Sequence, residues 1–103
     1  MTLCEAIDKL NQGVPSSVSG AQDFLNTLPL DVQQQLISAI YLGSDHMQSS
    51  KLRDDLEISR SYTDHIGQDQ YAEVLHKKRD VCLNYLNKLQ ACANASGFDL
   101  NKI

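Results

Sequence analysis

The 103-residue sequence contains few residues that interrupt helices and no long apolar run. It has only two prolines, Pro15 and Pro29, and five glycines. No stretch approaches the roughly 20 consecutive apolar residues of a membrane-spanning helix, so we expect no membrane partner. The sequence also lacks alternating strand patterns, internal repeats and low-complexity segments. These absences together favour a helical, soluble protein.

Positive charge is scarce as well. Nine Lys and Arg residues stand against 13 Asp and Glu residues, which gives a net charge of −4. Because binding to nucleic acid depends on clustered positive charge, we expect no nucleic-acid partner. The first residues, MTLCEAIDKL, carry acids where a secretory signal has a basic and then an apolar region. A cytoplasmic location is therefore expected.

Cysteines and histidines are too few and too scattered for a recognisable metal site. If Cys82 and Cys92 share one helix, its rise separates them by about 15 Å, which is beyond the reach of a disulfide. Neither a Cys-x-x-Cys nor a His-x-x-x-His spacing occurs. Zinc needs three or four convergent ligands, so we expect free thiols, no metal and no other cofactor.

Helical periodicity predicts one all-α domain, residues 1–103, with about five helices around a buried central helix. Thr2 and Glu5 have capping-box spacing and begin a first helix that Gly13 ends. Ser17 caps a second helix. The third, residues 30–42, is apolar almost all round, which predicts burial by several neighbours.

Glycines mark the expected ends of the later helices. Gly43 stands where a left-handed residue would end the third helix. A fourth helix is expected from Ser49 or Ser50 to Gly67, with an acidic outer face. The fifth runs from about Asp69 to Ser96, where Gly97 and Phe98 have the form of a Schellman ending. Lys78 interrupts its apolar stripe. That lysine either extends its ammonium to water, pairs with the acidic helix, or marks a groove.

Enzymatic chemistry finds little support in the residue spacing. His65 and Asp69 lie on either side of Gly67, and His76 follows on the fifth helix, but these are too few ligands for a convincing metal site. The third and fourth helices resemble a helix-turn-helix only in spacing, because the second helix would present Asp54 and other acids to DNA. We therefore expect a protein that is not an enzyme.

An interaction module is the function most compatible with this sequence. We expect it to bind another protein, or a second copy of itself, by surface contact. The candidate partner-binding residues are the acids of the fourth helix and the aromatic rings near Gly67: Asp54, Asp55, Glu57, Tyr62, His65 and Tyr71. Such rings are enriched at interface centres, while rim charges steer encounter. Alternatives are a mobile-element or phage-type inhibitor that sterically blocks a host complex, and a metal-dependent enzyme that uses His65 and His76.

Residues 24–46, FLNTLPLDVQQQLISAIYLGSDH, resemble the central segment of a family of small bacterial proteins of unknown function. In that family an apolar helix ends in aromatic-x-Gly-Arg-x-Asp, which Tyr41, Gly43 and Asp45 match here, with Ser44 in place of the arginine. The resemblance implies a helical fold and no established activity.

Overall fold

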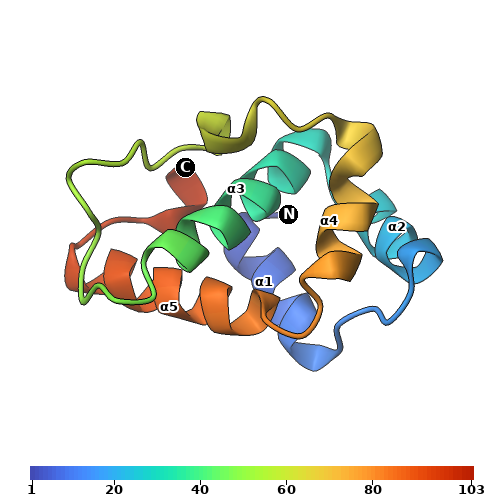
Figure 1. Cartoon of the computed structure of the whole chain (residues 1–103), viewed down its shortest axis with the longest axis horizontal. Helices are drawn as coiled ribbons and strands as arrows, with labels where there is room; N and C mark the ends of the chain where they lie inside the picture. Colours follow the sequence, from blue (N-terminus) through green and yellow to red (C-terminus); the bar gives the residue numbers. More distant parts are fainter.

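The computed structural model describes all 103 residues as five α-helices and three short 3-10 helices, with no strand (Figure 1). The α-helices are α1 (Leu3–Gln12), α2 (Val18–Asn26), α3 (Leu30–Asp45), α4 (Tyr71–Lys77) and α5 (Cys82–Ala95). The 3-10 helices are η1 (Arg60–Thr63), η2 (Gln68–Gln70) and η3 (Leu100–Lys102). The predicted all-α bundle is confirmed.

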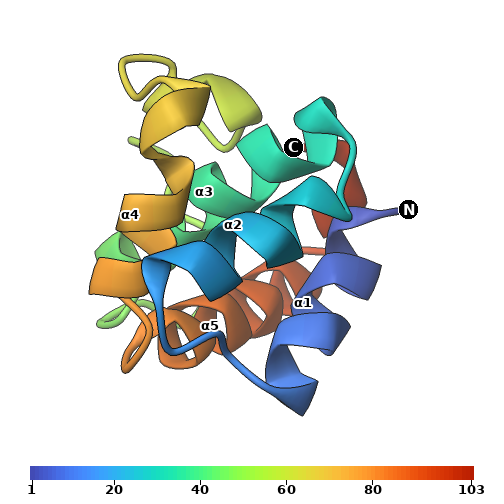
Figure 2. The ribbon, with the colours of Figure 1, turned by 90° about the vertical axis from the view of Figure 1, so that its right-hand side faces the viewer.

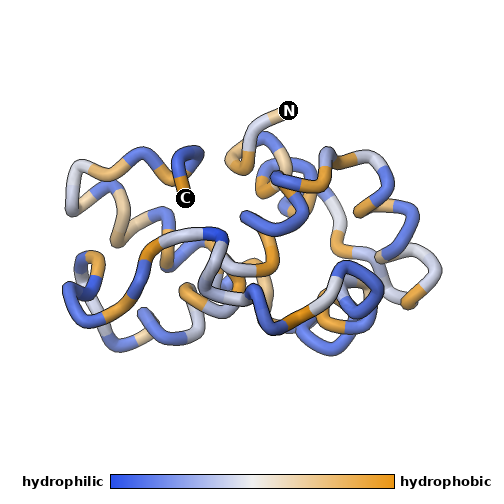
Figure 3. Tube along the Cα trace, turned by 90° about the horizontal axis from the view of Figure 1, so that it is seen from above, coloured by the Kyte–Doolittle hydropathy of each residue, from blue (hydrophilic) through white to orange (hydrophobic).

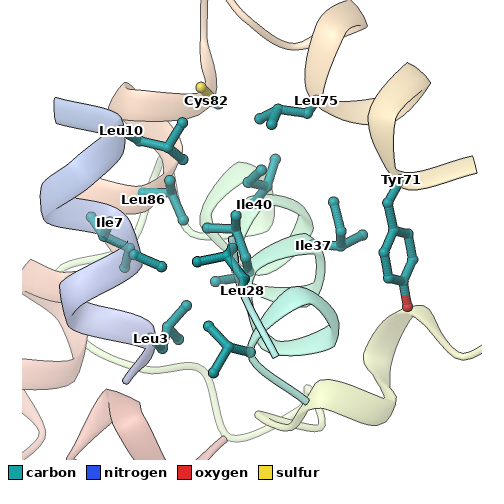
Figure 4. Close-up of a cluster of buried hydrophobic side chains, with 14 of the residues drawn as sticks. Leu3, Ile7, Leu10, Leu28, Ile37, Ile40, Tyr71, Leu75, Cys82 and Leu86 are labelled. Atoms are coloured by element: carbon teal, nitrogen blue, oxygen red, sulfur yellow. The ribbon is translucent and has the colours of Figure 1, made fainter. Parts of the chain in front are cut away.

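Helix α3 is the buried centre, as its apolar circumference predicts. Ten of its 16 residues are buried, and it packs most extensively on α5 and η1. On another side of the molecule, α2 and α4 pack against each other (Figure 2). All five α-helices contribute to a core cluster of 22 buried residues, part of which Figure 4 shows. Hydrophobic positions accordingly recur along every helix (Figure 3).

Several helix ends lie where the sequence predicts them. The Thr2 side chain accepts from the Glu5 N–H, the Glu5 carboxylate accepts from the Thr2 N–H, and Gly13 ends α1. Ser17 Oγ accepts from the Gly20 N–H at the start of α2. Gly97 adopts φ 66° after α5. These caps depend on neighbouring residues alone, which makes them readable from sequence.

Gly43 does not end α3, contrary to the sequence prediction. The helix continues to Asp45, and Gly43 lies where α3 crosses α5. A Cβ atom at this position would come within 2.9 Å of Tyr85 Cα and closer still to the Tyr85 carbonyl group. Glycine is needed here for the close approach of two helix backbones, and no left-handed conformation is involved.

The predicted long helix from Asp69 to Ser96 is also wrong, because residues 78–81 divide it into α4 and α5. The two halves have different neighbours, since α4 packs on α2 whereas α5 packs on α3. Lys78 therefore ends α4 and does not interrupt a continuous stripe. Its ammonium lies 4.7 Å from the centre of the Tyr41 ring.

No α-helix forms between residues 49 and 67, so the predicted fourth helix is wrong. Residues 46–59 have neither helix nor strand, and only η1 follows them. Two backbone donors of this stretch bind side chains more than one helical turn away in the sequence. The Leu52 N–H donates to Ser96 Oγ, and the Arg53 N–H donates to His46 Nε2. Such bonds compete with the i to i−4 bonds of a helix.

Polar side chains of α3 tie the helix to the rest of the chain. Gln35 donates to the carbonyls of Asn101 and Ile103, and Ser38 Oγ donates to the Arg60 carbonyl over 2.7 Å. A further hydrogen bond, from the Cys4 N–H to Asn101 Oδ1, joins α1 to η3.

No helix in the structure is long and apolar enough to span a bilayer.

Candidate functional site

The candidate site is the irregular stretch of residues 46–59, hereafter the 46–59 segment. It leaves the C-terminal end of α3 and runs along one end of the molecule to η1 (Figure 1). Residues 48–55 line an open hollow of about 480 Å³. Stretches of this length without regular secondary structure are uncommon in small domains and frequently carry function.

His46 fixes the start of the segment. Its side chain is completely buried, and its Nδ1 lies 2.7 Å from the Leu42 carbonyl oxygen. The Arg53 backbone N–H donates to its Nε2 over 3.1 Å. Since a backbone N–H can only donate, Nε2 carries the lone pair and Nδ1–H donates to Leu42. The neutral imidazole therefore links the last turn of α3 to residue 53.

Arg53 organises a polar group that we call the Arg53 cluster, formed by Asp45, Arg53, Asp55 and Tyr62. Its guanidinium binds both carboxylate oxygens of Asp55, at 3.0 and 2.5 Å, and a third N–H donates to the Asp45 carbonyl. The Tyr62 hydroxyl donates to the Asp45 carboxylate. The Arg53 contacts connect the segment to the end of α3, and the Tyr62 contact connects the same residue of α3 to η1.

Hydrogen bonds within this cluster shift the pKa values of Asp55 and Tyr62. Hydrogen bonding to Arg53 lowers the pKa of Asp55, so the carboxylate stays ionised at neutral pH. The hydrogen bond to Asp45 raises the pKa of Tyr62, which keeps its hydroxyl neutral. Neither Asp55 nor Tyr62 is therefore poised to exchange a proton near pH 7.

A further anchor comes from α5. Ser96 Oγ accepts from the Leu52 N–H over 2.9 Å, and Cys92 Sγ lies 3.6 Å from the Ser49 carbonyl oxygen. His46, Ser96 and Cys92 are structural residues of the segment that the sequence interpretation missed. Only His46 offers a recognisable signal, because it follows an almost wholly apolar helix and could therefore be a buried cap.

The residues expected to bind a partner are not all on the surface. Asp54, Asp55, Glu57 and His65 are exposed, and Tyr62 is half-buried within the Arg53 cluster. Tyr71 is only 4% exposed, and its ring points into the edge of the core from α4 (Figure 4). It therefore contributes to packing and presents no surface to a partner.

The histidines and cysteines do not assemble into a reactive centre. No group of three His, Cys, Asp or Glu side chains is placed to hold a metal ion. His65 is exposed, whereas His76 is half-buried on α4 and its Nδ1 has no hydrogen-bond partner. Burial raises the pKa of the Cys82 thiol, and that of Cys4 as well. High thiol pKa values oppose nucleophilic chemistry at neutral pH.

Comparisons with protein-family models, with curated proteins and with solved structures return no match for this chain. The resemblance of residues 24–46 to a family of small bacterial proteins therefore stays a prediction. The residues that carry it lie on α2, on α3 and in the turn between them.

Proposed function

We propose that this protein is a small cytoplasmic, non-catalytic interaction module that binds a protein partner through the 46–59 segment and the adjoining η1. The proposal rests on one observation. The 14-residue irregular segment is hydrogen-bonded to the helical core through Leu52 and Arg53, while its acidic side chains remain exposed. A rigid surface lowers the entropy lost on binding.

The composition of the surface supports a protein partner. Asp54 and Glu57 supply exposed negative charge, and Met47 is 41% exposed at the start of the segment. Methionine and tyrosine are enriched at interfaces, and surface charge accelerates encounter with a partner of opposite sign. We therefore expect the partner to present a basic surface to the 46–59 segment.

The test is capture of partners on the immobilised protein, followed by quantitative mass spectrometry. We compare the wild type with Asp54→Lys/Glu57→Lys, which reverses the two exposed acids. The matched control is Asp8→Lys/Asp23→Lys, which changes net charge equally on the exposed faces of α1 and α2. A partner retained by the wild type and the control, but lost on the segment variant, supports the proposal. Equal retention by all three folded proteins contradicts it.

A further inference from the structure

A second surface feature lies between α3 and α4 and has chemistry opposite to that of the 46–59 segment. It is a hollow of about 340 Å³, which we call the lysine pocket. Its wall is formed by Tyr41, Ile66 and Val74, which are half-buried. Its polar lining residues are Gln70, Glu73, Lys77 and Lys78.

The two lysines of this pocket have no anionic partner within the chain. The single salt bridge of the structure joins Arg53 to Asp55. The Lys78 ammonium lies over the face of the Tyr41 ring, 4.7 Å from the ring centre. Because the helix breaks after Lys77, both lysines and Arg79 lie together at one turn of an otherwise acidic protein. The pocket thus combines apolar area with a net positive charge, because two lysines stand against the single carboxylate of Glu73 and neither forms a salt bridge with it.

The complement of this pocket is present in the same chain. Residues 54–57 read Asp-Asp-Leu-Glu, an apolar side chain between carboxylates. Asp55 is neutralised by its own Arg53, which leaves Asp54 and Glu57 as the free acids. Figure 1 places this stretch at the end of the molecule beyond the C-terminus of α3, whereas α4 lies on the other side of α3. One copy of the chain therefore cannot satisfy both features by itself.

We propose that the lysine pocket receives residues 54–57 of a second copy of this chain, so that the protein associates with itself head to tail. Lys77 and Lys78 would pair with Asp54 and Glu57, and Leu56 would lie against Tyr41, Ile66 and Val74. This inference rests on the proposed function, because it names a second copy as one partner of the 46–59 segment. Since the contact joins two different surfaces, repetition yields either a closed ring or an open chain.

Charge and contact size determine what solution measurements should show. The pocket is small, so the contact belongs to the weak, transient class of interfaces. We expect sedimentation velocity to show association that grows between about 10 µM and about 1 mM protein. Added salt should weaken it, because the contact depends on partly exposed charges.

Two charge-reversal variants test the pairing directly. Asp54→Lys/Glu57→Lys places lysines opposite lysines, and Lys77→Glu/Lys78→Glu places acids opposite acids. Each variant alone should associate at least about tenfold more weakly than the wild type. An equimolar mixture should regain association, since every mixed contact again joins opposite charges. Asp8→Lys/Asp23→Lys, with the same charge change as the first variant, should associate like the wild type.

Each variant is first shown to melt as the wild type does. A wild type that remains monomeric at about 1 mM overturns the inference. Association that both variants retain, or a mixture that does not recover, overturns it equally. None of these results tests the proposed function, which is contradicted separately if partner capture is independent of Asp54 and Glu57.

Discussion

Single residues hold the 46–59 segment in place, and His46 is the most informative of them. His46→Phe keeps a ring in the buried position but leaves the Leu42 carbonyl and the Arg53 N–H without their partners. A buried group left unsatisfied costs about 1–3 kcal/mol, and the Arg53 N–H is only partly buried, so we expect a loss of about 1–3 kcal/mol in unfolding free energy. Urea denaturation measures this loss. Amide exchange at Arg53 should accelerate more than exchange in α1, and equal acceleration at both would contradict an anchoring role.

Tyr62, a single residue of η1, makes a pH-dependent contribution to the free energy of unfolding. Its hydrogen bond to Asp45 raises its pKa above the ordinary value of 10.0. A raised pKa in the folded state means that the stabilisation is fully present below the unfolded pKa and is lost as pH rises through the folded value. Relative to the wild type, Tyr62→Phe should therefore lose stability at pH 7 and show a shallower decline above about pH 10.

Urea denaturation from pH 7 to about pH 11 checks this dependence on Tyr62. Burial also raises the pKa of Tyr71, but that residue is common to both proteins and cancels in the difference. Identical slopes for wild type and variant would show that the Tyr62 hydroxyl makes no stabilising bond.

At the scale of elements, the crossing of α3 and α5 depends on Gly43. Alanine ordinarily stabilises a helix interior by roughly 1 kcal/mol relative to glycine. Here the added Cβ would overlap the Tyr85 backbone, so Gly43→Ala should instead destabilise the protein by about 1–3 kcal/mol or more. Thermal melting shows whether the substitution raises or lowers the stability of the protein. Gly13→Ala is the control, because a Cβ there meets nothing within 4 Å and should change stability by less than about 0.5 kcal/mol.

Elements whose limits depend on neighbouring residues could be predicted from the sequence, and the others could not. Thr2, Ser17 and Gly97 mark helix ends through local hydrogen bonds or backbone conformation. The 46–59 segment is irregular partly because the Leu52 N–H finds Ser96, 44 residues away. The break at residues 78–81 reflects the separate packing of α4 on α2 and of α5 on α3. No local pattern contains those partners.

The same distinction applies to the candidate site. Exposure of Asp54, Asp55 and Glu57 follows from their charge and was predictable, although the helix expected to carry them is absent. Tyr71 lies on the apolar stripe of its helix as well as near the Gly67 turn, so the sequence is compatible with either a core or a surface position, and the structure places it in the core. A groove at Lys78 is one of the three sequence interpretations of that residue, but Tyr41 and Ile66 could not be predicted as its lining, because only the fold brings them together with Lys78.

In the whole molecule, hydrogen bonds to the helical core order the acidic surface of the 46–59 segment. The protein's net charge of −4 is modest, and the free acids of the 46–59 segment lie apart from the basic turn at Lys77–Arg79. Because acidic and basic groups lie on different parts of the molecule, a partner with a basic surface is attracted to the acidic segment in one orientation. The same holds for the basic turn of a second copy. We therefore expect contacts with other protein molecules at this segment and none at exposed acids elsewhere, such as Asp23 on α2.

Site-specific photocrosslinking in living cells tests that claim most directly. A photoreactive phenylalanine analogue is placed at Glu57 in one variant and at Asp23, an exposed acid of α2, in another. We expect discrete crosslinked protein products from position 57 and none from position 23. No product at position 57, or the same products from both positions, would contradict the assignment of the 46–59 segment as the binding surface.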